Sequence, residues 1–381
     1  MVILDAPYAS DMLLSWLEES QHPVLTNRFT RSIDGFKLNL VDDATAISLI
    51  DSGQRVYTNS ENALAWIMEN THADSLKHGI SVFKDKLEMR RVLKDLDKNL
   101  FFKECAADEL AVINYSELPE TIVLKPTVGF CSMGVYVINN AQEWQNALED
   151  IKRDSARWQQ MYPDSVVNAG RFIIEDYICG QEYAIDAFFD SQGKVHVLNV
   201  LKHDFASAED TSDRMYTTGA DIYAQMAPVF TDWLQKVNEV VRVRDFPIHV
   251  EVRVNGQHVS PIEFNPMRFA GLGGTDVSQY AFGFKTYQAY LDNAIPDMSA
   301  YKLHTEKVFT MSLLNPPADT DGTENFDYDA FIENFQMVHE MRKFDVSKVG
   351  NYGFLFIETT PDSSELDFLM HDDLSRFIEK R

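Results

Sequence analysis

The chain has few cysteines and a marked shortage of basic residues. Its 381 residues include three cysteines, Cys105, Cys131 and Cys179. Their number is odd and their spacing does not fit a metal site, so we expect reduced thiols in a reducing compartment. Only 34 lysines and arginines stand against 59 acidic residues, which gives a net charge of -25. Such a charge repels nucleic-acid phosphates and anionic membrane surfaces, so we expect neither as a partner.

Long hydrophobic runs are also missing. No stretch approaches the roughly 20 apolar residues of a membrane-spanning helix. The first residues, Met1 to Asp5, lack the basic and apolar regions of a signal peptide. We therefore expect a cytoplasmic protein. Hydrophobic residues make up 45% of the chain and aromatic residues 12%, which is typical of a globular protein with more than one core.

The pattern of apolar residues predicts three regions. Residues 1–80 are expected to form a small α/β domain with a parallel sheet, in which Ser10 caps a helix or holds a substrate carboxylate. This region has no glycine-rich dinucleotide fingerprint. Residues 81–300 combine strands, hairpins and helices, which favours an α+β catalytic domain. Residues 301–381 are expected to be a C-terminal α/β appendage.

Two late strands carry oxygen ligands. Alternation along a strand places Glu251 on the face opposite the valines of the segment Pro247–Val254. In the segment Val259–Pro266, Glu263 and Asn265 share a face. Two carboxylates and an amide form a set that suits hard divalent cations. The alternative is a solvated acidic face on a surface hairpin.

The connection between these strands must set their register. Asn255 and Gly256 ordinarily favour a two-residue turn. Pairing Val254 directly with Gln257, however, would place Glu251 on the apolar face of the second strand, because a one-residue slip reverses every side chain. We therefore predict a loop of three or five residues that brings Glu251 near Glu263 and Asn265.

Further upstream, a strand ends in a lysine and a loop of small residues. Lys125 follows Ile122–Leu124 and precedes a loop, residues 126–134, that contains Ser132 and Gly134. Backbone N–H groups in such a loop can surround phosphate oxygens, although the loop does not have the Walker pattern. An ordinary β-turn connection is the alternative.

The order of these features resembles the ATP-grasp superfamily of the carboxylate–amine ligase type, with a preceding α/β domain. The order is a lysine on a helix, a lysine on a strand, a small-residue loop, an acidic hinge at residues 175–182, and the late Glu…Glu-x-Asn hairpin. The resemblance covers about residues 80–295. It implies an α+β ATP-grasp fold with two subdomains that hold ATP between them.

The resemblance also implies roles for individual residues in nucleotide binding. Lys86 and Lys125 would contact the phosphates of ATP, covered by the loop with Ser132 and Gly134. Four hinge residues complete the set, with Glu175 near the adenine amino group, Tyr177 and Ile178 reading the base edge, and Glu182 on the ribose hydroxyls. A solvated helix charge is the alternative for Lys86, and an exposed strand residue is the alternative for Glu182.

The remaining implied roles concern metal ions and substrates. Glu251, Glu263 and Asn265 would bind Mg²⁺, with two ions expected and Mn²⁺ as a substitute. Arg268 stands one place later than the arginine of the family's Asn-Pro-Arg pattern, and it would either contact substrate or form a loop salt bridge. Lys202 would contact the γ-phosphate, so that Lys125, Lys202 and Arg268 form the catalytic set. His203 and Arg214 either bind substrate or are surface or core-edge residues.

The resemblance implies an ATP-dependent, ADP-forming ligase that joins a small carboxylate to an amine through an acylphosphate. Its expected partners are these two small molecules. Whether the chain forms a homo-oligomer is left open by the sequence. An ATP-grasp kinase, a thiol ligase and a degenerate nucleotide-binding regulatory module are the alternatives. The sequence does not identify the acid or the amine.

Overall fold

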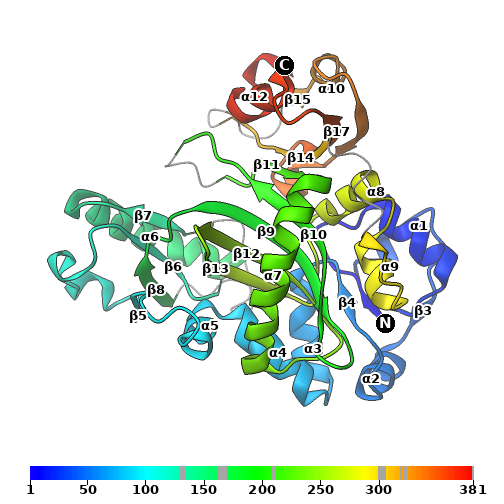
Figure 1. The fold of residues 1–381 in the computed structure, drawn as a ribbon, viewed down its shortest axis with the longest axis horizontal. Coiled ribbons are helices and arrows are strands. Elements are labelled where there is room, and N and C mark those ends of the chain that lie inside the picture. The colour runs from blue at the N-terminus through cyan, green and yellow to red at the C-terminus, as the bar shows by residue number, and fades with distance from the viewer. Residues whose placement is uncertain are drawn as a thin grey trace.

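The computed structural model describes residues 1–128, 134–161, 170–207, 212–298, 306–317, 320 and 324–379, and Figure 1 shows their arrangement. The N-terminal part is a parallel four-stranded sheet in the order β3-β2-β1-β4. Ser10 caps the first helix, because its side-chain oxygen accepts the backbone N–H of Leu13 at 3.2 Å. The predicted small parallel-sheet domain is confirmed. Its elements are β1 (Val2–Ile3), α1 (Asp11–Ser20), β2 (Val24–Leu25), β3 (Leu40–Val41), α2 (Asp43–Asp51), β4 (Tyr57–Thr58) and α3 (Leu64–Asn70).

A second, antiparallel sheet of four strands has the order β5-β8-β6-β7. It contains the predicted strand that ends near Lys125, and its core is formed with α6 around Trp144 and Phe172. The elements are β5 (Phe102–Ala106), β6 (Ile122–Pro126), β7 (Tyr136–Ile138), α6 (Ala141–Met161) and β8 (Arg171–Asp176). In Figure 1 this unit projects to the left of the central sheet.

The central sheet has eight antiparallel strands in the order β13-β12-β9-β10-β11-β14-β17-β16. Mixed helices and antiparallel sheets confirm the predicted α+β class. The strands are β9 (Gln181–Phe189), β10 (Val195–His203), β11 (Met215–Thr218), β12 (Phe246–Asn255), β13 (His258–Pro266), β14 (Val308–Leu314), β16 (Val338–Lys343) and β17 (Gly353–Thr359). The helices between them and before them are α4 (Asp74–Lys84), α5 (Lys86–Leu93), α7 (Ala220–Val241), α8 (Val277–Phe282) and α9 (Thr286–Leu291).

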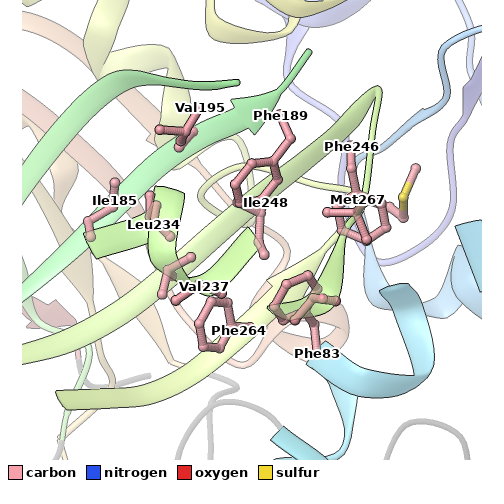
Figure 2. Packing of buried hydrophobic residues seen from close by; sticks show 14 of the residues in the cluster. Phe83, Ile185, Phe189, Val195, Leu234, Val237, Phe246, Ile248, Phe264 and Met267 are labelled. Atoms are coloured by element: carbon pink, nitrogen blue, oxygen red, sulfur yellow. The ribbon is translucent and has the colours of Figure 1, made fainter. Parts of the chain in front are cut away.

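The main hydrophobic core covers one face of this sheet. Helices α4 and α7 pack on it, and Figure 2 shows Phe83 of α4 and Leu234 of α7 among the side chains of the strands. The rings of Phe83 and Phe264 stack with centroids 4.7 Å apart. Each large apolar side chain buried here contributes about 1.5–3 kcal/mol. Because successive strand residues point to opposite faces, the residues that alternate with this core are left to line a site on the other face.

The hairpin of β12 and β13 differs from the prediction in its loop. Asn255 pairs with His258, so the turn contains only Gly256 and Gln257, and Gly256 adopts a positive φ of 61°. The predicted odd-length loop is therefore wrong. A β-bulge in β13 corrects the register instead. Val252 pairs with Pro261 and the preceding residue, Glu251, pairs with Glu263, so Ile262 is the extra residue. The bulge supplies the extra residue that the loop was expected to supply.

The C-terminal strands β14, β17 and β16 continue the central sheet beyond β11. The division at residue 301 stays a prediction, but these strands are joined to the preceding region by ladder hydrogen bonds. The remaining elements are β15 (Asn325–Phe326), α10 (Tyr328–Ile332), α11 (Val346–Val349), α12 (Ser364–His371) and β18 (Ile378–Glu379). Of these, β15, α10 and α12 are labelled at the top of Figure 1, close to β17. Among the described residues, no helix is both long and apolar enough to cross a membrane.

Candidate nucleotide and metal site

A cleft of about 860 Å³ opens on the face of the central sheet opposite the main core. Residues from the N-terminal region, the four-stranded sheet, the central sheet and the C-terminal region line it. A volume of this size accommodates a ligand as large as a nucleotide with part of a second molecule. The cleft brings together eleven of the residues singled out from the sequence, which are Lys86, Lys125, Glu175, Tyr177, Ile178, Glu182, His203, Arg214, Glu251, Glu263 and Arg268.

The other predicted residues lie differently. Asn265 is 2% exposed and donates its amide to Glu263 Oε1 at 3.2 Å, directly beside the cleft wall. Lys202 is not among the lining residues, and its ammonium group pairs with Asp204 at 2.9 Å. Its neighbour His203 lines the cleft instead. Gly134 has a positive φ of 70° and is not a lining residue, while Ser132 lies outside the described residues.

Polar side chains form rows across the strands that floor the cleft. In one row Glu263 is opposite Glu251, which is opposite Ala184. The next row contains Asn265, His249 and Asp186, and a third contains Arg253, Glu182 and His203. The predicted ligand set Glu251, Glu263 and Asn265 is therefore contiguous.

The two carboxylates differ in their electrostatic surroundings. Burial, reinforced by the charge of Glu263, raises the pKa of Glu251 to about 7. Burial alone would also raise the pKa of Glu263. The ammonium group of Lys86, which lies 2.7 Å from Glu263 Oε2, outweighs this effect, so the net pKa of Glu263 is lowered. A second cation beside Glu251 would relieve the repulsion between the acids.

The donor set fits a hard cation that shares its coordination with another ligand. Within the described ranges, no three His, Cys, Asp or Glu side chains are grouped so as to hold a metal ion by themselves. Two carboxylates and one amide oxygen leave coordination positions for phosphate oxygens or water, which is the usual situation of Mg²⁺ in nucleotide sites.

A buried ion-pair network joins helix α5 to the four-stranded sheet. Glu175 is 2% exposed, and its two oxygens lie 2.7 Å from Arg90 Nε and 2.6 Å from Lys125 Nζ. Burial alone would raise the pKa of Glu175, but the two cations outweigh it and lower the pKa to about 2. Arg90 lies on α5 and was not singled out from the sequence, where a helical arginine gives no sign of a buried partner.

The hinge region is fixed by a second set of contacts. Glu182 accepts a hydrogen bond from His203 Nδ1 at 2.9 Å and another from Arg253 Nε at 2.9 Å. Arg253 also donates to the carbonyl oxygen of Ile178 at 2.7 Å, and its guanidinium lies 4.9 Å from the ring centre of Tyr177. Arg253 shares a strand face with Glu251, and this alternation is the signal that could have assigned it to the site.

Arg268 reaches the cleft from the loop after β13. Its Nη2 lies 2.8 Å from Glu61 Oε1, and Lys84 contacts the other oxygen of Glu61. The loop salt bridge considered for Arg268 is thus present, and the residue also lines the cleft. Burial would raise the pKa of Glu61, but Lys84 and Arg268 outweigh it and lower the pKa to about 2.

This arrangement predicts an acid-dependent contribution of Glu61 to stability. A carboxylate whose pKa is lowered on folding stabilises the native state above its unfolded pKa, about 4.5, and this stabilisation is lost as the pH falls toward 2. We expect Glu61→Gln to reduce the free energy of unfolding at pH 7 by about 3 kcal/mol. The difference from the wild type should shrink between pH 4.5 and pH 3 in urea unfolding. A difference that stays constant over that range would contradict the assignment.

A histidine lies next to the predicted metal ligands. His249 is 6% exposed, and its Nδ1 lies 2.7 Å from Asp186 Oδ1. Its Nε2 lies 3.7 Å from Glu251 Oε1. Burial would lower the pKa of His249, but its hydrogen bond to Asp186 and the nearby carboxylate of Glu251 outweigh this effect and raise the pKa to about 9. The imidazolium therefore adds positive charge beside the acidic row at neutral pH.

Comparisons with known proteins identify the fold. Residues 118–276 match the model of the ATP-grasp domain. The structure resembles an L-amino acid ligase from Bacillus licheniformis, with a TM-score of 0.69, 17% identity, and coverage of 99% of this chain and 97% of that one. It also resembles N5-carboxyaminoimidazole ribonucleotide synthetase from Thermotoga maritima, with a TM-score of 0.63, 12% identity and coverage of 99% and 98%.

A third similar structure, N5-carboxyaminoimidazole synthetase from Staphylococcus aureus, contains ADP. Its TM-score is 0.61, its identity 13%, and the coverage is 98% of this chain and 96% of that one. No curated protein matches the sequence. At these identities the structural matches establish the fold.

Proposed function

We propose that this chain, whose residues 118–276 match the ATP-grasp domain, is an ATP-dependent ligase that joins a small carboxylate to an amine and releases ADP and phosphate. One observation carries the proposal. The row of Glu263 and Glu251 lies in the same cleft as Lys86, Lys125 and the hinge of Tyr177 and Ile178. Groups suited to a metal ion, to phosphates and to a planar base are thus brought together by three separate parts of the chain.

In this proposal the cleft binds ATP with its base at the hinge and its phosphates toward the carboxylate row. The Ile178 carbonyl is held by Arg253, so the hinge backbone is fixed before a base arrives. Glu182 is oriented by His203 and Arg253 and would accept the ribose hydroxyls. Lys86 and Lys125 would neutralise phosphate charge, and the loop around Gly134 would cover it.

The residues Glu251, Glu263 and Asn265 would hold Mg²⁺, with Mn²⁺ as a substitute, and two ions are expected. The ion would neutralise charge on the terminal phosphates when it is bound. The protein's own part is to hold these ligands in one row and to keep Lys86 beside Glu263.

The proposed reaction has two steps. A substrate carboxylate oxygen attacks the γ-phosphorus, the bond to the β-phosphate oxygen breaks, and ADP leaves with that electron pair. The amine nitrogen then attacks the acyl carbon, the bond from carbon to the phosphate oxygen breaks, and the nitrogen loses a proton. Positioning and charge neutralisation provide most of the acceleration in phosphoryl transfer. Arg268 lines the cleft and would stabilise the charge that develops in these steps.

The requirement for two substrates gives a direct test. We expect ADP release only when both a carboxylate and an amine are present, because the acylphosphate is protected from water until the amine attacks it. Amino acids and small carboxylates should be screened in pairs, with amino acids first because one similar structure is named as an L-amino acid ligase. With the acid alone, hydroxylamine should trap a hydroxamate. Rapid ATP consumption that requires neither acid nor amine would refute the proposal.

The products also separate the alternatives. A kinase would transfer phosphate to a stable product, and a thiol ligase would give a thioester that hydroxylamine cleaves. A degenerate binding module would bind nucleotide and release no ADP with any pair. The chain spans nearly the full length of the similar ligase structures. The presence of Lys86, Lys125 and the carboxylate row in one cleft favours a ligase over a degenerate binding module.

A further inference from the structure

A single carboxylate, Asp186, lies behind the predicted metal ligands. It is completely buried in β9. Its Oδ1 accepts hydrogen bonds from His249 Nδ1 at 2.7 Å and from the backbone N–H of Ala270 at 2.9 Å, and its Oδ2 accepts one from Thr275 Oγ1 at 2.6 Å. A buried carboxylate costs several kcal/mol unless it is satisfied in this way. Three donors fix both oxygens, so Asp186 has one well-defined orientation.

His249 connects this carboxylate to the ligand row. The strand register places His249 between Asp186 on β9 and Asn265 on β13. Along its own strand, Glu251 is the next residue on the same face, and His249 Nε2 lies 3.7 Å from Glu251 Oε1. Because Nδ1 is held by Asp186, the ring cannot turn without breaking a buried hydrogen bond. Nε2 therefore stays directed toward Glu251.

The same carboxylate also fixes the loop that carries Arg268. Ala270 and Thr275 both belong to the segment that follows β13, and both donate to Asp186. Asp186 is thus the common anchor of His249, which lies beside the predicted metal ligand Glu251, and of the loop that carries Arg268. Carboxylate ligands depend on such support, since their own side chains rotate freely.

We propose that Asp186 and His249 act as a positioning pair that orients Glu251 for metal binding. The inference rests on the proposed function, because that function brings a divalent ion and a nucleotide to Glu251. Neither residue is proposed to bind the ion. Asp186 acts through His249, and loss of either member leaves Glu251 free to adopt orientations that cannot share an ion with Glu263.

A purely structural role makes a different prediction. If the pair only completes a buried polar network, substitution lowers the stability of the fold and leaves the ion affinity of the folded protein unchanged. If the pair orients Glu251, ion affinity falls in protein that is fully folded. In addition, the two substitutions share one mechanism, so their effects on affinity do not add.

The experiment measures Mn²⁺ affinity with ADP present, by electron paramagnetic resonance of free Mn²⁺. The proteins are the wild type, Asp186→Asn, His249→Gln and the double variant. We expect each single variant to bind Mn²⁺ about 10–100-fold more weakly than the wild type. The double variant should be within about threefold of the weaker single variant.

A matched control is available on the same sheet. His196 pairs with Asp190 at 2.8 Å, on β10 next to β9, but it does not line the cleft. His196→Gln therefore removes a similar histidine–aspartate pair and should bind Mn²⁺ within about threefold of the wild type. Circular dichroism and thermal unfolding show that each protein is folded under the conditions of the titration.

Three results would overturn the proposal. They are folded variants with wild-type Mn²⁺ affinity, losses that add in the double variant, and an equal loss in His196→Gln. If Asp186→Asn does not fold, His249→Gln decides the question alone, with the same expected loss. A wild-type protein that binds neither Mn²⁺ nor ADP would instead refute the proposed function, and the positioning role would fall with it.

Discussion

Replacing Glu263 by glutamine is expected to lower substrate-dependent ADP release by about 10³-fold. The amide keeps the size of the side chain and can still contact Asn265, whose amide lies 3.2 Å from Glu263 Oε1 in the native protein. It removes the charge that pairs with Lys86 at 2.7 Å and the second carboxylate of the proposed metal row. The row would then hold a single carboxylate, too little charge to fix a divalent ion against phosphates.

The measurement is a coupled assay of ADP release with the acid and amine that the screen identifies. Glu239→Gln is the control, because this substitution removes the same charge at an exposed position near the end of α7. We expect this variant to keep full activity. Activity of Glu263→Gln within tenfold of the wild type would show that Glu263 is not a metal ligand for the reaction.

Replacing Glu175 by glutamine is expected to destabilise the fold by about 3–5 kcal/mol. Glu175 is the anion between Arg90 and Lys125, and all three side chains are at most 5% exposed. Glutamine leaves two cations buried close together with no counter-charge. The cost of a buried uncompensated charge greatly exceeds that of a lost surface ion pair.

Urea unfolding at pH 7 measures this difference in the free energy of unfolding. Glu104→Gln is a matched control, since Glu104 also pairs with two arginines, Arg91 and Arg171, but its side chain is 35% exposed. We expect that variant to lose about 1 kcal/mol or less. Equal losses in the two variants would show that solvent screens the Glu175 network as it screens a surface pair.

The sequence was most informative where strand alternation decides which side chains share a face. Glu251, Glu263 and Asn265 were predicted to lie together on that basis, and the register of β12 and β13 places them side by side. The alternation of side chains correctly indicated that the hairpin needs one extra residue to bring Glu251 and Glu263 to the same face. It could not indicate whether that residue lies in the loop or in a strand, because an odd-length loop and a β-bulge restore the same alternation.

Other parts of the site depend on contacts between residues distant in sequence. Arg90 reaches Glu175 across 85 positions, and Asp186 reaches Thr275 across 89. No local pattern reports such pairs. Lys202 and His203 present a related difficulty, because β10 has an irregular register between Val197 and Asn199. The irregularity shifts the alternation of side chains in the rest of β10. As a result His203 lines the cleft and Lys202 does not.

The continuity of β14 with β11 has a practical consequence for dissecting the chain. A fragment that stops near residue 300 would lack β14, β17 and β16 and would leave Met215–Thr218 as an uncovered sheet edge. Unpaired backbone N–H and C=O groups at such an edge recruit strands from neighbouring molecules. We therefore expect a fragment that ends near residue 300 to self-associate and not to form a stable monomeric domain.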